Sequence, residues 1–206
     1  MVLINDFTMI FARKYLLYFL IVVAIAALET VIAAKIYPEI ASIKNDIWRI
    51  IPSPGDPDRN IYTRAAVATQ GTLASKKPEQ AYFLTEIDIE EQPLTGSCLY
   101  KLSGEDIDSR WWSINPYAED GFLIENSEKL YSYNSETINY NPTGGYEIYF
   151  LGNNEFITEI SDKNWLRVNS DENFSIALRV YNPGEEFFSN LKRVNLPIVE
   201  KVRCSE

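Results

Sequence analysis

The hydrophobic residues follow two different patterns along the chain. Between Tyr15 and Ala34 apolar residues continue without a polar face and are interrupted only at Glu29 and Thr30. Beyond Ile51, short apolar runs alternate with clusters of turn residues. Twenty helical residues span about 30 Å, the thickness of the apolar core of a bilayer. The first pattern therefore predicts a transmembrane helix over residues 15–36, and the second predicts a domain of short strands.

The residues beside the predicted helix suit the two surfaces of a membrane. Arg13 and Lys14 precede the helix and Tyr37 follows it, as is typical of interface residues. Glu29 is near the far end, where it is expected to reach the interface, and contact with a partner helix is the alternative. The two bases directly before the helix favour a cytoplasmic N-terminus, so residues 1–14 are interpreted as a cytoplasmic leader.

A cleaved signal peptide is a competing interpretation, because Ala24-Ile25-Ala26 has the small residues of a cleavage site. The long polar leader and the apolar residues beyond Ala26 favour a retained anchor. A buried core helix is disfavoured because the segment has no polar face. We therefore expect a single-pass membrane protein with its C-terminal domain in the periplasm or outside the cell.

Residues 37–55 are expected to form a stalk and linker, with helical character between Pro38 and Trp48. The end of this segment is rich in residues that break regular structure, with prolines at positions 52, 54 and 57 and Gly55 between them. We place the soluble domain at residues 56–206. A domain of this length can bury a hydrophobic core without needing disulfides or metal ions.

Within the domain, the pattern predicts one helix over Thr63–Gln70 and one or two helical turns within 184–191. Eight strands are expected, at residues 81–87, 98–102, 111–117, 121–124, 146–151, 164–168, 174–181 and 194–202. In the strand at 174–181, Phe174, Ile176 and Leu178 share one face. This spacing of short strands is typical of a β-sandwich or jelly-roll-like domain, so the predicted fold is mainly β with one or two short helices.

Charge and composition exclude several classes of function. The net charge is −10, and residues 1–50 carry four acidic and five basic side chains, so the rest of the chain carries −11. An acidic domain repels phosphate backbones, so no nucleic-acid partner is expected. The chain has no histidine, which removes histidine acid–base catalysis, the Ser-His-Asp arrangement and histidine-ligated metal sites. No metal and no cofactor are expected.

The two cysteines, Cys98 and Cys204, are 106 positions apart. We favour a disulfide over two buried thiols, because a domain that follows an anchor can lie in an oxidising compartment. The bond would connect the last predicted strand to the strand that contains Cys98. Closing so long a loop would contribute roughly 4–5 kcal/mol of stability.

Several short motifs in order resemble the domain of unknown function 1214 family. They are Asp56-Pro57 before Ile61–Ala65, then Arg110–Ile114, Asp120–Ile124, Asn164–Leu166 and Phe174–Tyr181. The N-terminal helix, Trp48, the pair Cys98 and Tyr100, and Cys204 also resemble a membrane-tethered, single-domain subgroup. Three additional residues at 58–60 depart from that subgroup's pattern at the start of the helix.

The resemblance covers the domain from about Asp56 to Cys204 and implies a β sandwich. It also implies that a companion domain of unknown function often accompanies this one, either fused to it or encoded separately. A companion envelope protein is therefore an expected partner in addition to the membrane. The resemblance implies no reaction, and no catalytic residue is carried over.

Six residues are candidates for ligand binding: Tyr62, Arg64, Arg110, Trp111, Trp112 and Trp165. Arg64 would clamp an anion, although helix capping with one ion pair is the favoured interpretation. Trp111 and Trp112 occupy opposite faces of one strand. One ring is expected in the core, and the other is expected to be exposed, to stack on a partner or to lie beneath a loop.

Acidic residues provide a weaker basis for chemistry. Six carboxylates lie in two groups, Glu86, Asp88, Glu90 and Glu91 and then Glu119 and Asp120. A pair of this kind can catalyse glycoside hydrolysis, but in so acidic a domain some pair always fits.

Three functions remain open. The favoured one is a non-enzymatic envelope protein whose domain binds a partner protein or a small ligand, since the chain has neither a nucleophile motif nor a cofactor motif. The second is a carboxylate-dependent enzyme acting on an envelope carbohydrate or small molecule. The third is an accessory subunit of a membrane complex.

Overall fold

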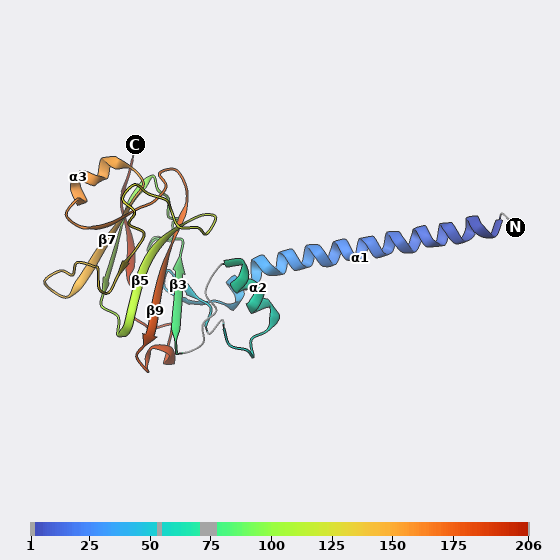
Figure 1. Cartoon of the computed structure of the whole chain (residues 1–206), viewed down its shortest axis with the longest axis horizontal. Coiled ribbons are helices and arrows are strands. Elements are labelled where there is room, and N and C mark those ends of the chain that lie inside the picture. Colours follow the sequence, from blue (N-terminus) through green and yellow to red (C-terminus); the bar gives the residue numbers. More distant parts are fainter. Residues whose placement is uncertain (1–2, 53–54, 71–77, 206) are drawn as a thin grey trace.

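A computed structural model describes residues 3–52, 55–70 and 78–205 of the chain. One long helix, α1 (Leu3–Ala41), projects from a β domain (Figure 1). Every side chain from Ala12 to Ile32 is exposed. Among the helices described, α1 alone is long and apolar enough to cross a membrane. The helix extends beyond both ends of the predicted span at 15–36.

The β domain is a sandwich of two sheets. The larger sheet has the order β1-β2-β3-β9-β5-β6 and all its pairs are antiparallel. Its strands are β1 (Ile43–Asn45), β2 (Trp48–Ile50), β3 (Gln80–Thr85), β9 (Phe174–Pro183), β5 (Ser109–Ala118) and β6 (Tyr133–Asn134). The helix α2 (Ile61–Gln70) lies between β2 and β3 in the chain and packs on α1.

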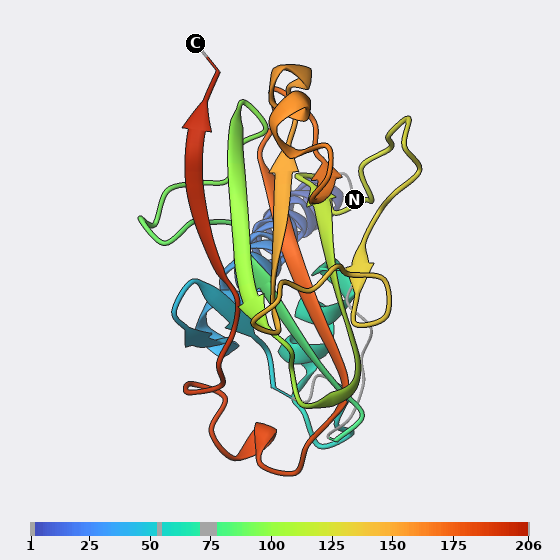
Figure 2. The same cartoon turned by 90° about the vertical axis from the view of Figure 1, so that its left-hand side faces the viewer.

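The smaller sheet has the order β10-β4-β7-β8. Its strands are β10 (Ile198–Cys204), β4 (Cys98–Glu105), β7 (Gly145–Leu151) and β8 (Asn164–Arg167). Strands β7 and β8 are parallel, whereas the other pairs are antiparallel. Seen from the far end of the molecule, the smaller sheet is in front, with the larger sheet and then α1 behind it (Figure 2). The larger sheet is therefore the one nearer to α1.

Alternation of side chains along the strands builds the core between the sheets. Phe83, Ile114 and Leu178 from the larger sheet are fully buried, as are Leu102 and Ile148 from the smaller sheet. A second buried cluster lies on the other face of the smaller sheet. It forms where the 3-10 turn Asn154–Phe156 and the helix α3 (Ile157–Ile160) cover strands β4 and β7.

These observations confirm the predicted mainly β, sandwich-like fold. The jelly-roll form of that prediction is not confirmed. Seven of the eight predicted strands are present, with ends shifted by a few residues. The predicted strand at 121–124 is not a strand, because only Leu123 forms a bridge, to Tyr117, after the turn at Gly121. The 3-10 turn Phe187–Ser189 lies where one or two helical turns were expected.

The segment predicted to be a stalk is more ordered than expected. Helix α1 continues to Ala41, and the next residues form the hairpin β1–β2, which pairs with β3 through β2. The indole of Trp48 is buried and donates a hydrogen bond of 2.6 Å to the carbonyl oxygen of Pro197. The amide of Asn45 donates to the carbonyl oxygen of Val194 at 2.8 Å. The residues after α1 are thus fixed to the sandwich.

The predicted disulfide is confirmed. Cys98 and Cys204 are bonded and lie directly opposite each other in the register of β4 and β10. The bond connects the last strand to the strand that contains Cys98, as the sequence predicted.

Candidate functional site

A pocket of about 520 Å³ lies on the outer face of the larger sheet. Its floor is built from strands β3, β9 and β5, whose alternate residues point into the core or away from it. The outward side chains that line it are Tyr82 and Leu84 from β3, Ser175 and Arg179 from β9, and Tyr117 from β5. The edge of this sheet that contains β3 lies nearest to α1 (Figure 1), and α1 leads directly into β1 and β2 at the same edge.

Arg179 occupies the centre of this arrangement. Its guanidinium lies 5.2 Å from the centroid of the Tyr82 ring and 5.5 Å from that of the Tyr117 ring. It also donates a hydrogen bond to the phenolic oxygen of Tyr117. Strand register explains the placement, since Arg179 is directly opposite Tyr82 on β3 and opposite Ser113 on β5.

The guanidinium of Arg179 is half-buried and makes no ion pair with a carboxylate of the described residues. An arginine carries five N–H donors in a planar fork, which suits a carboxylate or another planar acceptor. The two tyrosine rings hold the cation in place while leaving donors available. The site can therefore accept an anionic or acceptor group.

The phenol of Tyr82 is expected to stay protonated at neutral pH. Burial raises the pKa of Tyr82, and the nearby charge of Arg179 acts in the opposite direction without cancelling that effect. A protonated phenol both donates and accepts hydrogen bonds. The pocket thus offers neutral hydroxyl groups beside one fixed positive charge.

Three exposed carboxylates, Glu86, Glu119 and Asp120, line the same pocket. Glu86 accepts a hydrogen bond of 2.8 Å from Arg49. Asp120 accepts from the backbone N–H of Phe122 at 3.0 Å and so stabilises the turn after β5. The pocket therefore combines a central cation with an acidic wall, which suits a ligand that carries both acceptor and donor groups.

Two of the candidates predicted from the sequence, Tyr62 and Arg64, lie on α2 beside α1. Arg64 donates to the carbonyl oxygen of Pro57 at 3.1 Å, and the ring of Tyr62 is 5.5 Å from that of Tyr37. The cap of α2 is Asn60, whose side-chain oxygen accepts from the N–H of Thr63.

The other four candidates are spread over both sheets. Trp112 is fully buried and stacks on Tyr146 at 4.8 Å, whereas Trp111 is on the outer face of β5 with its ring 5.3 Å from that of Tyr181. Arg110 is exposed on the same strand. Trp165 is half-buried on β8, beneath the guanidinium of Arg167. The six candidates do not form one cluster and none lines the pocket around Arg179, so their ligand-binding role stays a prediction.

Sequence reasoning did not identify Tyr82, Tyr117 or Arg179 as site residues. The alternation recognised in 174–181 already placed Arg179 on the face opposite Leu178. It did not indicate that β9 lies between β3 and β5, which brings the two tyrosines to the arginine. Three of the six carboxylates noted in the sequence do line the pocket.

A partly exposed ion pair fixes the loop before β6 to β8. Arg167 donates from Nε to one oxygen of Glu128 and from Nη2 to the other, both at 3.0 Å. This pairing lowers the pKa of Glu128 from 4.5 to about 2. Because the folded pKa is depressed, the pair contributes stability above pH 4.5 that is lost as the pH falls toward 2.

We therefore expect Glu128→Gln to lower the free energy of unfolding by about 1 kcal/mol at pH 7, the value for a well-formed pair near the surface. Urea unfolding at pH 7, 4 and 3 should show the difference between wild type and variant shrinking as the pH falls. The exposed neighbour Glu125 provides the control, and Glu125→Gln should give no such trend. A constant difference at all three pH values would contradict the assignment.

Comparison with known proteins identifies the family. The family model described as "Protein of unknown function (DUF1214)" matches residues 79–185. No curated protein matches the chain. Among solved structures, the VPA0106 protein from Vibrio parahaemolyticus is 22% identical with a TM-score of 0.57, covering 70% of this chain and 36% of that one. An uncharacterised protein from Burkholderia cenocepacia is 13% identical with a TM-score of 0.42, covering 72% of this chain and 44% of that one.

The first of these structures supports the fold alone, and this chain spans only about a third of its length. The family match runs from the residue before β3 to the residues after β9. It therefore includes all three strands that form the floor of the pocket, and the resemblance found in the sequence is confirmed. The chain belongs to the DUF1214 family of proteins of unknown function.

Proposed function

We propose that the protein is a single-pass membrane protein whose β sandwich binds a small ligand in the pocket around Arg179. The main observation in support is the half-buried guanidinium of Arg179, which is held between two tyrosine rings. It makes no ion pair with a carboxylate of the described residues. A charge of this kind is costly to desolvate without a counter-charge, so a ligand that supplies one gains affinity. The volume of the pocket is in the range of small-molecule sites.

The proposed topology has a cytoplasmic leader at 1–14, a membrane span at 15–36 and a domain in the periplasm or outside the cell. The exposed apolar surface of α1 supports the span, because such a surface is unfavourable in water. The disulfide supports the location of the domain, because structural disulfides persist in oxidising compartments.

Glucuronate is a suitable first probe, because it carries one carboxylate for Arg179 and several hydroxyl groups for the acidic wall. We expect it to raise the melting temperature of the full chain in detergent, whereas glucose, which lacks the carboxylate, should not. Arg179→Gln should weaken binding by about 10- to 100-fold, corresponding to one charged hydrogen-bonding group.

The control for Arg179→Gln is Arg110→Gln, because Arg110 is exposed on the neighbouring strand and does not line the pocket. Binding of glucuronate should be unchanged in this variant. Equal binding of glucuronate and glucose to wild type, or equal loss in both variants, would refute the role of Arg179.

A carboxylate-dependent enzyme is the second candidate function, favoured by the presence of Glu86, Glu119 and Asp120 in the same pocket. Two carboxylates on either side of a bound sugar can act as an acid and a base. Release of reducing sugar from glucuronate-containing oligosaccharides would support this alternative, provided that Glu119→Gln abolishes the release and retains binding. Binding without turnover would favour the non-enzymatic function.

A further inference from the structure

Helix α2 is attached to α1 near the C-terminal end of the apolar part of α1. The phenol of Tyr37 donates to the side-chain oxygen of Asn60 at 3.0 Å and lies 3.2 Å from the hydroxyl of Thr63. Along α1, the side chains first become partly buried at Ala33 and Ala34, and again around Tyr37. These positions share one face of the helix. The start of α2 therefore packs against the last turns of α1.

In the proposed topology, this position along α1 corresponds to the surface of the membrane. The apolar run of α1 ends where Lys35 begins the polar part of the helix, and Tyr37 is two residues further on. At 1.5 Å per residue, the contact with α2 lies within about 5 Å of the end of the apolar run. The headgroup layer begins at this level and is several ångströms thick.

The exposed side chains of α2 suit this layer. Ile61 is 72% exposed and Tyr62 is 50% exposed, so neither is buried by the β sandwich. Arg59 and Arg64 are exposed beside them. Apolar and tyrosine side chains together with arginine are typical of helices in the interface, where arginine pairs with lipid phosphates.

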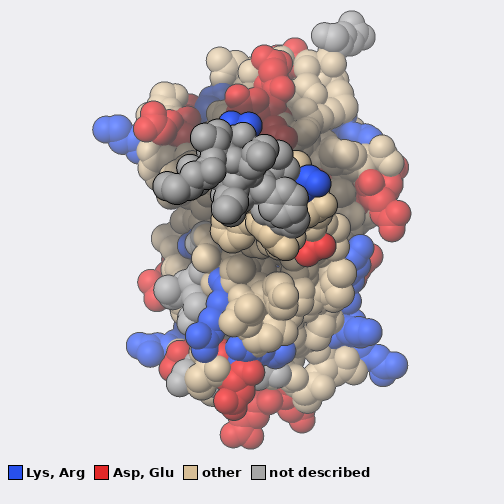
Figure 3. Space-filling model, turned by 90° about the vertical axis from the view of Figure 1, so that its right-hand side faces the viewer, with Lys and Arg blue, Asp and Glu red and all other residues tan. Residues whose placement is uncertain are grey.

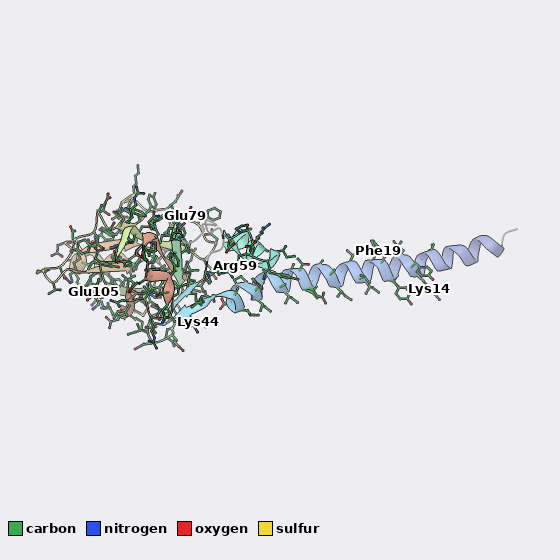
Figure 4. All side chains as sticks on the ribbon, turned by 90° about the horizontal axis from the view of Figure 1, so that it is seen from below. Lys14, Phe19, Lys44, Arg59, Glu79 and Glu105 are labelled. Atoms are coloured by element: carbon green, nitrogen blue, oxygen red, sulfur yellow. A yellow bond between two sulfur atoms is a disulfide. The ribbon has the colours of Figure 1, made fainter. Side chains whose placement is uncertain are left out.

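The arrangement in space agrees with a membrane-facing position. Figure 4 shows Arg59 beside α2, between the β sandwich and the projecting part of α1 that carries Phe19 and Lys14. Figure 3 looks along α1 toward the domain. Uncharged residues occupy much of the middle of this view, several Lys and Arg side chains lie among and below them, and acidic side chains lie mainly toward its edges on all sides. Asp56 and Asp58 directly precede Arg59, so the start of α2 carries charges of both signs, and its exposed apolar and tyrosine side chains provide the membrane contact.

We infer that α2 is a second membrane contact, which lies in the phospholipid headgroup layer and holds the β sandwich in one orientation. The inference rests on the proposed membrane anchor. Its consequence is that the edge of the larger sheet that holds β1, β2 and β3 is kept next to the membrane surface.

Site-directed fluorescence quenching tests the inference on the full chain. Single cysteines are introduced as Ile61→Cys, Val22→Cys and Thr158→Cys and labelled with an environment-sensitive fluorophore. Both native cysteines are in the disulfide and do not react. The proteins are reconstituted into vesicles of phosphatidylcholine and phosphatidylglycerol without spin-labelled lipid, with lipid labelled near the headgroup, or with lipid labelled deep in the acyl chain. Thr158 is exposed on α3, at the end of the domain far from α1 (Figure 1), and is the control for Ile61.

The expected result is loss of fluorescence at position 61 with the headgroup label and at position 22 with the acyl-chain label, and none at position 158 with either label. Quenching at 22 with position 61 behaving like position 158 would overturn the role of α2 and leave the anchor intact. Absence of quenching at 22 by the acyl-chain label would overturn the anchor itself. Ile61 is exposed, so its replacement does not disturb the core, and recovery of the disulfide-bonded protein confirms that each variant is folded.

Discussion

Reduction of the Cys98–Cys204 disulfide should lower the free energy of unfolding of the β domain by about 4 kcal/mol. The bond closes a loop with a sequence separation of 106 residues. In the unfolded chain, this closure removes many conformations, and reduction restores them. The effect therefore acts mainly on the unfolded state, with a magnitude set by the length of the loop.

In the folded state, the disulfide also holds the end of β10 against β4. This strand lies at the edge of the smaller sheet, pairs with β4 alone, and has a register shift between Lys201 and Arg203. Its last residues are exposed, although Arg203 contacts Glu159 and lies over the ring of Phe156. After reduction, we expect the end of β10 to separate from β4 before the rest of the domain unfolds.

Tryptophan fluorescence makes this measurement specific to the domain. The four tryptophans lie at positions 48, 111, 112 and 165, and α1 has none. Urea unfolding of the full chain in detergent, with and without reductant, therefore follows the β sandwich alone. The double variant Cys98→Ala/Cys204→Ala is the control, because reductant should not change its unfolding. Identical urea midpoints for oxidised and reduced wild type would contradict the prediction.

Much of the fold could be predicted because the apolar residues have a regular spacing. Phe174, Ile176 and Leu178 alternate as a half-buried strand must, and each is buried in the core. The hairpin β1–β2 could not be found in this way. It has two strands of three residues each, and the turn at Asp46 requires a positive φ of 56°, which a non-glycine residue rarely adopts.

The candidate site was less predictable because it depends on which strands are neighbours. Arg179 and Tyr82 are adjacent in the sheet but 97 positions apart in the chain. Neither residue belongs to a motif that indicates binding. Their meeting follows from the insertion of β9 between β3 and β5, which is set by packing of the whole sandwich and not by any local pattern.

Gly96→Ala is expected to have the second large effect on stability. A Cβ atom at this position would lie 1.6 Å from the carbonyl oxygen of Asn169 and 2.6 Å from its carbonyl carbon. The N–H of Gly96 also donates to the carbonyl oxygen of Glu172 at 2.9 Å, which holds the two segments together. Since the obstructing atoms belong to the backbone, no change of rotamer relieves the overlap. Only separation of the segments around Gly96 and Asn169 can do so.

We expect this substitution to lower the free energy of unfolding by about 3 kcal/mol or more, at the upper end of the range for overpacking. Gly152→Ala should come next, because its Cβ would lie 2.4 Å from the carbonyl oxygen of Gly96 and 2.5 Å from the Cα of Ser170. Gly145→Ala is the matched control, with its nearest atom, the carbonyl oxygen of Gly104, at 3.1 Å.

The same urea titration ranks the three variants. A loss that is largest for Gly96→Ala and smallest for Gly145→Ala would establish that close backbone contact limits residue size at this end of the sandwich. If Gly96→Ala were no less stable than Gly145→Ala, the segment around Asn169 could move away without cost. The contact between Gly96, Gly152 and Ser170 would then not contribute to the stability of the domain. Because Gly96 lies two residues before Cys98, such freedom would also weaken the expectation that reduction first releases β10 and not the segment before β4.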